Sequence, residues 1–553
     1  MSLLVSKLSP LVPRSLSTQD VQVICQPITK RIKQPEVIYT QVSQDSRNMD
    51  PNGVFVAVRG TEVDGHDFIE GLNYSPNLLI IGEDAPESYP EVDNYMQVAN
   101  TRKIVGPLAQ AFAGDPWKYL QVIGITGTNG KTTTATLLYE LLSRSGKAVS
   151  LLGTVSKRIL DSEIPSALTT SDPIELANDM QAMVNAGSTY LIMEVSSHAL
   201  DQYRVYGIPF SIAIFTNITH DHLDYHGDLE TYIKAKKKLF DDLKPGSWTI
   251  INADDPHSGY MIKDTNAQIF SVGLTDNEGN LFKKGASLVK QPDLIYPTIP
   301  SWVQKRTCTV ESLGLQGTIL FDKTSNKRWE LPLIGLFNAY NALQAITAAQ
   351  LLGINSAELE KYNQGLFGVP GRLERVCIND GARIQLNDAL SPQKESNGKR
   401  YPSVFVDYAH TPDALENICS TLAELKESHQ KLLVVFGAGG DRDPRKRPLM
   451  AQACEKWGDI AIVTTDNPRS EPPDSIIKEI CLGFSKEFMT DQVHIEVERA
   501  KAIALALDLA SADDIVVIAG KGHEIYQEIK GVKHPFDDRK VAYELLKAWN
   551  EAA

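Results

Sequence analysis

The amino-acid sequence predicts an α/β protein of three domains. Its 553 residues suit about three to four domains of ordinary size. With 42% hydrophobic and 22% charged residues, the composition is that of a folded globular protein rather than a disordered one. From about residue 118, apolar runs alternate with segments of helical periodicity, which is typical of parallel strands joined by helices. We expect a small mixed domain at residues 1–117, a central doubly wound sheet at 118–369 and a Rossmann-like α/β domain at 370–553.

The strands and helices behind this division can be assigned in chain order. In the first domain, apolar runs at 54–58 and 78–81 stand between turn-rich segments and predict a small mixed sheet. Four buried parallel strands are predicted in the second domain, at 119–126, 190–195, 211–216 and 248–252, and an alanine-rich helix at 338–352 closes it. Strands of the third domain are predicted at 404–406, 432–436, 460–464 and 515–519. The polar stretches 283–307 and 387–401 are interpreted as surface insertions.

Charge and cysteine content exclude several classes of protein. A net charge of −14 argues against a non-specific nucleic-acid binder, which needs a basic face. The six cysteines contain no C-x-x-C pair, so neither a zinc ribbon nor a disulfide scaffold is expected. No apolar run approaches the ~18 residues of a membrane span. We expect a cytoplasmic monomer that binds small molecules and neither nucleic acid nor membrane.

A glycine-rich loop predicts a phosphate-binding site. Residues 124–133, G-I-T-G-T-N-G-K-T-T, follow a predicted strand and open a helix, so backbone N–H groups and the helix dipole can face phosphates. Lys131 supplies a charge for the β- and γ-phosphates, and Thr132 offers a hydroxyl to Mg²⁺. The spacing departs from G-x-x-x-x-G-K-T, because Ile125 stands where the first glycine belongs and Gly124 is one residue early. The alternative is a tight strand-to-helix turn, and the loop alone leaves kinase, GTPase, motor and ligase chemistry open.

Acidic and imidazole side chains follow the next two predicted strands. Glu194 ends one strand, at the sheet edge where ligands gather, and is a candidate Mg²⁺ ligand or a solvated carboxylate. Residues 220–226 hold three His and two Asp in a chain with 11 His, a mixture that suits Mg²⁺ better than Zn²⁺. A polar turn with one functional histidine is the alternative. In the lysine run that follows, Lys234, Lys237 and Lys238 are interpreted as a solvated helix face.

Together these segments resemble the Mur ligase family, the ATP-dependent ligases that build the peptide of peptidoglycan. The resemblance spans essentially the whole chain. It rests on T-G-T-N-G-K-T-T, E-V-S-S-H, D-H-L-D-Y-H-G, Y-x-x-A-K-x-x-L-F, G-x-x-N-x-x-N, P-G-R-L-E and D-Y-A-H-T-P, in the family's order. It implies that Lys236 is carbamylated, which is chemically sensible because a carbamate, unlike an ammonium, can face Mg²⁺.

The resemblance also implies a set of site residues. The implied catalytic residues are Lys131, Lys236, His222 and Glu194, and the implied metal ligands are Thr132, Glu194, His222 and Lys236 as its carbamate. ATP would be bound by Gly127, Thr128, Asn129, Gly130, Lys131, Thr132, Thr133, Asn341, Arg372 and Asp407. The UDP-linked substrate would contact Ser46, Thr61, Glu62, Val63, Thr169, Thr170, Ser196, Gln202 and Arg204. For the D-S-R segment around Ser46 alone, an Asx-type turn is the simpler interpretation.

The third domain carries the features that select the incoming amino acid. D-N-P-R at 466–469 resembles the form found in family members that add meso-diaminopimelate, and the implied binding residues are Arg442, Asp466, Asn467, Pro468, Arg469, Gly520 and Glu524. Diaminopimelate differs from lysine by a second amino-acid head, whose carboxylate the Arg469 guanidinium can bind with two hydrogen bonds. Lysine would leave that guanidinium unpaired, at a cost of about 1–3 kcal/mol. A surface arginine after a turn is the alternative.

The sequence therefore predicts an ATP- and Mg²⁺-dependent amide ligase. Its expected substrates are UDP-N-acetylmuramoyl-L-alanyl-D-glutamate and meso-diaminopimelate, which would be joined through an acyl phosphate protected from water by domain closure. Three alternatives stay open: a lysine-adding ligase of the same type, a folylpolyglutamate-type ligase, and a P-loop regulatory ATPase.

Overall fold

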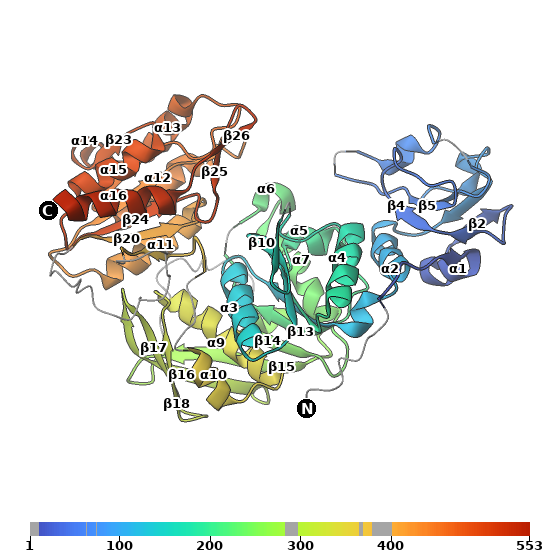
Figure 1. The fold of residues 1–553 in the computed structure, drawn as a ribbon, viewed down its shortest axis with the longest axis horizontal. Coiled ribbons are helices and arrows are strands. Elements are labelled where there is room, and N and C mark those ends of the chain that lie inside the picture. Colours follow the sequence, from blue (N-terminus) through green and yellow to red (C-terminus); the bar gives the residue numbers. More distant parts are fainter. Residues whose placement is uncertain are drawn as a thin grey trace.

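Three sheets follow one another along the chain and divide the molecule into three bodies (Figure 1). The structure is a computed structural model, and it describes residues 10–552 except 62, 73–74, 167, 220, 282–296, 364–368 and 379–400. Within these residues the three large sheets have five, eleven and six strands. Two small sheets have two strands each, one formed by β1 (Leu16–Ser17) and β3 (Ile38–Tyr39) and the other by a hairpin of the third body. The expected α/β architecture built on three sheets is confirmed.

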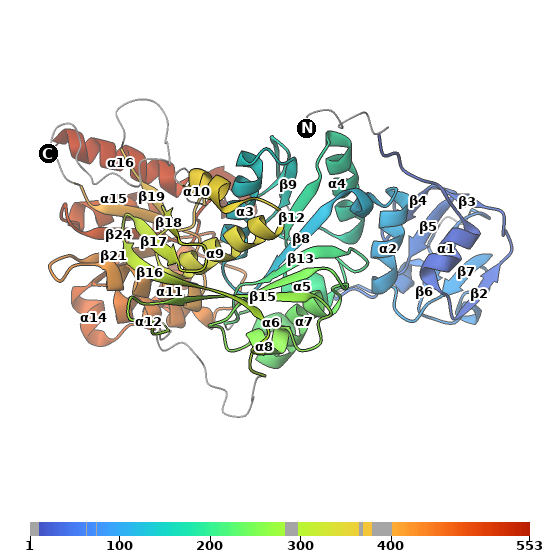
Figure 2. The same cartoon turned by 90° about the horizontal axis from the view of Figure 1, so that it is seen from below.

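The N-terminal sheet is small and mixed, as predicted. Its strand order is β2 (Thr29–Ile32), β7 (Asn94–Gln97), β6 (Leu79–Gly82), β5 (Gly53–Val56), β4 (Gln41–Ser43). The four strands β4 to β7 pair in parallel, whereas β2 pairs antiparallel to β7. Helices α1 (Thr18–Cys25) and α2 (Arg102–Phe112) share its core, and α2 also packs on α4 (Pro173–Ala186) of the central body (Figure 2).

The central sheet is parallel in its middle and antiparallel at both edges. Its strand order is β11 (Ser162–Pro165), β10 (Ser156–Ile159), β9 (Val149–Leu152), β12 (Tyr190–Glu194), β8 (Gln121–Thr126), β13 (Phe210–Phe215), β14 (Trp248–Asn252), β15 (Gln268–Thr275), β16 (Gln304–Gly314), β17 (Gly317–Asp322), β18 (Lys327–Leu331). In this sheet order, the strands from β9 through β12, β8, β13, β14 and β15 to β16 pair in parallel. Beyond them, β10 with β11 and β17 with β18 extend the two edges as antiparallel strands. Side chains of β8 alternate between two cores, Ile123 and Ile125 in one and Val122 in the other.

Helices cover both faces of the central sheet, as a doubly wound sheet requires. One core includes α3 (Lys131–Arg144) and α9 (Leu336–Leu351), and the other includes α4 and α7 (Leu229–Asp241). The remaining helices of this body are α5 (Ser197–Asp201), α6 (Leu223–His226), α8 (Ser258–Met261) and α10 (Ser356–Asn363). The carboxyl ends of β8, β12 and β13 therefore point to one edge, where the predicted loops lie.

Both predicted surface insertions include residues that belong to the folded core. Residues 304–307 begin strand β16, where the Arg306 side chain is buried, lies 3.3 Å from Asp322 and donates to Thr347. Tyr401, at the end of the second stretch, is also buried, with 5% of its surface exposed. The polar sequence did not indicate burial, because the partners of Arg306 come from distant parts of the chain. Residues 283–296 and 387–400 lie outside the described residues.

The third sheet is a second α/β unit. Its strand order is β19 (Glu374–Val376), β20 (Ser403–Asp407), β24 (Ile515–Ala519), β21 (Leu432–Phe436), β22 (Ile460–Val463), β23 (Val493–Ile495), parallel apart from β19. Its two faces carry α11 (Pro412–Leu425), α12 (Lys446–Trp457) and α13 (Pro473–Cys481) on one side, and α15 (Arg499–Leu509) and α16 (Asp538–Ala552) on the other. A hairpin of β25 (Tyr526–Ile529) and β26 (Val532–Pro535) leaves this unit after β24.

Candidate active site

The phosphate loop joins β8 to α3, and its two glycines have backbone conformations that other residues rarely adopt. Gly127 has φ +152° and Gly130, which precedes the first turn of α3, has φ +87°. A Cβ on Gly130 would lie 2.3 Å from Oδ1 of Asn341 on α9. Glycine is therefore required both by the turn and by the close approach of α9.

Gly124 accounts for the unusual spacing of the loop. It lies within β8, and a Cβ there would be 2.7 Å from the ring of Phe210 on the neighbouring strand. This glycine serves sheet packing, so the phosphate loop proper begins at Gly127. The departure from the common P-loop spacing leaves the cradle itself intact.

Two buried ammonium groups converge on the carbonyl oxygen of Gly127. Lys131 Nζ donates to Gly127 O at 2.9 Å and to Thr128 O at 2.8 Å, and Lys236 Nζ donates to Gly127 O at 2.9 Å. Burial lowers the pKa of Lys131, and burial followed by repulsion from Lys131 lowers the pKa of Lys236 well below its usual value. Positive charges buried on neutral carbonyls favour a bound anion, because an anion restores the electrostatic stabilisation lost with water.

Lys236 is held from two sides by the rest of the site. Its ammonium lies 4.5 Å from the ring centroid of Tyr232, one turn earlier on α7, and only 1% of the residue is exposed. The hydroxyl of Tyr232 lies 3.0 Å from Oγ1 of Thr128 in the phosphate loop. The predicted solvated face of this helix is wrong for Lys237, which is buried between Asp241 and Asp264.

Oxygen donors suited to Mg²⁺ lie beside the loop. Glu194 ends β12 with 1% exposure, and its Oε2 accepts from the hydroxyl of Thr132 at 3.0 Å. Thr154 also donates to Glu194, through its N–H at 2.8 Å and its hydroxyl at 3.0 Å. A hydroxyl and a carboxylate fit the hard ligand set of Mg²⁺.

The predicted histidine ligand lies on an exposed turn. His222 precedes α6 with φ +53°, and its ring centroid is 4.8 Å from that of His198. Among the described residues no group of three or more His, Cys, Asp and Glu is close enough to hold a metal. His220 lies outside the described residues. Thr132 and Glu194 are in hydrogen-bond contact, whereas the contacts described for His222 include Asp221 and the ring of His198.

Other predicted ATP-binding residues come from elements far away in the sequence: Arg372, Asp407 and Asn341. Arg372 Nη2 donates to Thr132 Oγ1 at 3.3 Å, its guanidinium lies 4.7 Å from the Tyr408 ring centroid, and its Nε is buried without a partner. Asp407 accepts from the N–H groups of Leu373 and Ala409, both at 2.7 Å, and burial raises its pKa. The carboxylate thus fixes the chain that carries Arg372.

A hydrogen-bonded cluster occupies the predicted substrate side of the central sheet. Thr170 Oγ1 donates to Glu194 O at 2.9 Å and accepts from Ser196 N at 3.1 Å. Arg204 donates to Gln202 Oε1 at 2.7 Å and to Thr170 O at 3.0 Å. Thr169 joins the cluster through Thr154 Oγ1 at 3.2 Å. These predicted residues form one contiguous surface next to Glu194.

The predicted uridine-binding residues lie on the separate N-terminal body. Asp45 Oδ1 accepts from Arg47 N at 3.0 Å, so the D-S-R segment around half-buried Ser46 does form an Asx turn. Thr61 and Val63 are exposed, and Glu62 lies outside the described residues. Among the described members of this set, no hydrogen bond or ion pair reaches the central cluster.

Arg469 is held in one orientation at the end of the third sheet. Its backbone is left-handed, with φ +50°, and is bonded to the β25–β26 hairpin through Glu528 O and Lys530 N. Its Nη1 donates to Gly440 O at 2.7 Å, and its Nε lies 3.5 Å from Oε2 of Glu528. With 24% of the side chain exposed, the guanidinium is neither in open solvent nor sealed away.

A fully buried lysine organises the other predicted amino-acid residues. Lys521 Nζ donates to Asn467 Oδ1 at 2.9 Å and to Glu524 Oε2 at 3.0 Å, and Asn467 Nδ2 also donates to Glu524. Asp466 is buried, and its Oδ1 has no hydrogen-bond partner. Gly520 has φ +118°, and a Cβ on it would lie 3.2 Å from Asp466 Oδ2. Arg442 is exposed, whereas Pro468 is buried.

Several residues at this site were missed by the sequence analysis. Lys521 lies in the segment G-K-G-H-E at 520–524, whose first and last residues were predicted, and a lysine between glycines near acidic residues was a usable signal. Thr154, Thr219 and Asp413 had none, because each is an ordinary polar residue that becomes part of the site only when distant segments meet.

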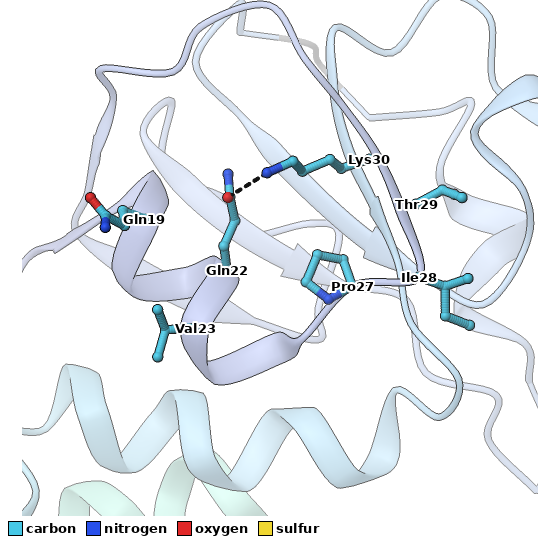
Figure 3. A pocket seen from close by; sticks show the side chains of 7 residues that line it. All are labelled: Gln19, Gln22, Val23, Pro27, Ile28, Thr29 and Lys30. Carbon is cyan, nitrogen blue, oxygen red and sulfur yellow. Dashed lines mark hydrogen bonds between the residues drawn. The ribbon is translucent and has the colours of Figure 1, made fainter.

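A surface pocket lies apart from these residues. It has a volume of about 560 Å³ and lies between α1 and β2. Figure 3 shows the side chains that line it: Gln19, Gln22, Val23, Pro27, Ile28, Thr29 and Lys30. None of the predicted site residues lines it. A much smaller cavity of about 10 Å³ lies against Thr132 and Glu194.

Comparison with known proteins assigns the family. Residues 38–113 match the catalytic domain of the Mur ligase family, residues 125–349 the Mur ligase middle domain, and residues 394–522 the Mur ligase, glutamate ligase domain. A protein of Phocaeicola vulgatus is 38% identical over 508 residues, covering 91% of this chain and 94% of that protein. The chain belongs to the Mur ligase family. The P. vulgatus relative is named UDP-N-acetylmuramoyl-L-alanyl-D-glutamate–2,6-diaminopimelate ligase.

Solved structures agree with this assignment. One of a UDP-N-acetylmuramoyl-L-alanyl-D-glutamate–2,6-diaminopimelate ligase superposes with a TM-score of 0.63 at 31% identity, covering 97% of this Mur ligase chain and all of the other. A folylpolyglutamate synthase of Mycobacterium tuberculosis, complexed with ADP and AMPPCP, has a TM-score of 0.53 at 18% identity and covers 76% of this chain and 92% of its own. The second likeness shows a shared fold alone.

Proposed function

We propose that this Mur ligase is an ATP-dependent amide ligase that adds meso-diaminopimelate to UDP-N-acetylmuramoyl-L-alanyl-D-glutamate. The observation that carries the choice of amine is the Arg469 guanidinium, anchored at Nη1 and Nε so that its Nη2 is directed by the fold rather than by solvent. The names of the relatives with 36–38% identity support the same substrate pair. The product would be a cell-wall precursor made in the cytoplasm by a monomer.

The reaction proceeds in two steps, phosphoryl transfer and amide formation. A γ-carboxylate oxygen of the D-glutamyl residue attacks the γ-phosphorus of ATP, the bond to the bridging oxygen breaks, and ADP leaves with that electron pair. The diaminopimelate nitrogen then attacks the acyl carbon, the C–O bond breaks, phosphate leaves, and the nitrogen loses a proton. Activation is needed because a carboxylate oxygen is a poor leaving group.

The residues at the phosphate loop supply binding and charge. Lys131 would bind the β- and γ-phosphates, and Arg372, reaching Thr132 from the third body, would bind the transferred phosphate. Thr132 and Glu194 would hold Mg²⁺, which when bound neutralises charge on the phosphate oxygens. Lys236 is the lysine we expect to be carbamylated, since its lowered pKa favours the neutral amine that reacts with carbon dioxide.

The amino-acid pocket has a charge balance that suits a diamino acid. Lys521 neutralises one of the two carboxylates of Asp466 and Glu524, which leaves one negative charge for an incoming ammonium group. Asp466 Oδ1, which has no hydrogen bond and lies 3.6 Å from Lys521 Nζ, would accept from it, and Arg469 would bind the distal carboxylate. A lysine substrate satisfies the first group and not the second.

A direct competition assay tests this function. The full chain is given ATP, Mg²⁺ and UDP-N-acetylmuramoyl-L-alanyl-D-glutamate with either meso-diaminopimelate or L-lysine, and product mass and phosphate release are measured. We expect kcat/KM for diaminopimelate to exceed that for lysine by about 10²-fold or more. Arg469→Ala should remove most of this preference, by lowering the diaminopimelate rate and not the lysine rate.

The control for that variant is a nearby exposed arginine. Arg445, which pairs with Asp443 and has 80% of its side chain exposed, should tolerate Arg445→Ala without a change in preference. A wild-type preference for lysine would overturn the assignment. ATP hydrolysis without either amino-acid substrate would instead indicate a regulatory ATPase, and glutamylation of folate a folylpolyglutamate-type ligase.

A further inference from the structure

The side chain of Asp413 crosses from the third body to the phosphate loop of the central body. Asp413 lies in the first turn of α11, the helix of the third sheet nearest the central sheet (Figure 1). The C-terminal half of this helix lies close to the central body. A Cβ on Gly335, just before α9, would be 2.7 Å from Cγ2 of Thr421 on α11.

One carboxylate oxygen of Asp413 accepts two hydrogen bonds from the central body. Thr219 Oγ1 donates to Oδ2 at 2.7 Å and Asn129 Nδ2 donates to the same atom at 3.2 Å. A third bond, from Asn417 Nδ2 at 3.3 Å, comes from its own helix. Asp413 is half-buried, and burial raises the pKa of its carboxyl group.

Asn129 is the phosphate-loop residue whose side chain depends on this contact. Its backbone is fixed within the central body, where its N–H donates to Asn217 Oδ1 at 3.0 Å and its carbonyl accepts from Thr216 Oγ1 at 2.6 Å. Its side-chain amide has a second, longer bond to Thr219 Oγ1, at 3.4 Å. Asp413 therefore binds both the amide and the hydroxyl that the amide contacts.

Thr219 carries the same contact to the other side of the loop. Its N–H donates to Thr128 Oγ1 at 2.9 Å, and Thr128 Oγ1 donates in turn to the carbonyl of Thr219 at 3.3 Å. The carboxylate thus stands at the end of a continuous hydrogen-bonded path, from α11 through Thr219 and Thr128 to the loop that faces the phosphates.

A helix-dipole role does not account for this position. An acidic residue in the first turn of a helix is favourable wherever it points, and exposure to solvent costs nothing. The Asp413 carboxylate is instead desolvated, which is unfavourable unless hydrogen bonds offset it, and the donors that do so belong mainly to another body.

We propose that Asp413 is a positioning residue, which couples the docking of the third body to the conformation of the phosphate loop. When α11 is docked, its carboxylate orients Asn129 and Thr219, and the loop is preorganised for the nucleotide. When α11 moves away, both groups lose their acceptor and the loop binds nucleotide less tightly. This inference rests on the proposed use of ATP and is independent of which amino acid is added.

Nucleotide affinity of the full chain tests the coupling. The dissociation constant of a non-hydrolysable ATP analogue with Mg²⁺ is measured by calorimetry, together with KM for ATP and for diaminopimelate. Asp413→Ala should weaken binding of the analogue and raise KM for ATP by about 10- to 100-fold, because the charge-assisted acceptor of Asn129 and Thr219 is lost. KM for diaminopimelate should change by less than about threefold.

A double-mutant cycle separates positioning from general destabilisation. Thr219→Val removes the partner hydroxyl, and the double variant should be little worse than either single one, because the two groups act together. Glu416→Ala, on the same helix but paired with Lys456 at 2.5 Å, is the matched control and should leave ATP binding unchanged. Asp413→Asn, which keeps an acceptor for Thr219, should be intermediate and replaces the alanine variant if that fails to fold.

The outcomes distinguish the two proposals. Additive effects of Asp413→Ala and Thr219→Val, or unchanged analogue binding in Asp413→Ala, would overturn the coupling. A wild-type chain that binds the analogue and does not form the amide would leave the coupling measurable and refute the proposed function instead.

Discussion

At the scale of single residues, burial decides how ionisable groups behave near the site. His523 follows the loop that carries Lys521, and its ring centroid lies 5.0 Å from that of Tyr408. Burial and the neighbouring charges of Arg372 and Arg539 lower the pKa of His523 to about 4, so the imidazole is neutral in the folded protein. Lys131 and Lys236 follow the same rule at the phosphate loop.

The histidine gives a prediction about acid stability. The unfolded chain binds a proton near pH 6.5 and the folded chain only near pH 4, so stability is fully present above about 6.5 and falls as the pH drops towards 4. The loss is at most about 3.4 kcal/mol for one such group. Melting temperatures measured across this pH range should fall less in His523→Gln than in wild type. Equal slopes in the two proteins would show that His523 is already exposed.

At the scale of elements, the phosphate loop is shaped by the packing of α3 against α9. The side chain of Asn341 on α9 occupies the space beside Gly130, and its Nδ2 donates to Asn338 Oδ1 at 3.3 Å. The loop is backed on its other side by the segment after β13, through Asn217 and Thr219. Its conformation thus belongs to three elements together.

Gly130→Ala is the substitution that tests this arrangement. Alanine at φ +87° costs about 1 kcal/mol, and its Cβ would lie 2.3 Å from Asn341 Oδ1, so the start of α3 must shift. We expect ligase activity to fall by about 10²-fold or more, because misplacing phosphate donors by a fraction of an ångström is costly in catalysis. Circular dichroism should show an intact fold. Gly146→Ala, where the added Cβ meets nothing within 4 Å, is the control.

At the scale of the whole molecule, the N-terminal body is attached through α2. Gly106 of α2 lies against the central body, where a Cβ would be 2.6 Å from the carbonyl oxygen of Tyr206. Close by, a Cβ on Gly207 would lie 2.9 Å from Cγ of Pro107 in α2. These contacts set the position of the proposed uridine-binding residues relative to the central cluster at Arg204.

Gly106→Ala therefore tests the attachment. Alanine favours an isolated helix over glycine by about 1 kcal/mol, so local propensity predicts a gain in stability. The clash with the Tyr206 carbonyl predicts the opposite, with KM for the UDP-linked substrate raised by about tenfold and KM for ATP unchanged. Steady-state kinetics with each substrate varied in turn decide between the two. An unaltered KM for the UDP-linked substrate would mean that α2 does not position this body.

The order and type of the main elements could be predicted from sequence because they depend on local periodicity. Strands β14, β21 and β24 have the predicted bounds, and the core strands of the central sheet differ from prediction by one or two residues. The edge hairpins and the strand at residues 304–307 were not predicted. Arg306 shows why: a charged residue was assigned to the surface, yet its partners Asp322 and Thr347 come from elsewhere in the chain.

By itself the sequence determined the glycine-rich loop, the family and the residue types of the proposed amino-acid pocket, because each depends on a short continuous motif. Tertiary structure alone decided that Lys521 neutralises Glu524, that Glu528 and Gly440 orient Arg469, and that Asp413 reaches Asn129. These interactions join residues from separate segments, and their energies arise only when folding removes water between them. No periodicity along the chain records such pairs, because burial and distance are properties of the folded molecule.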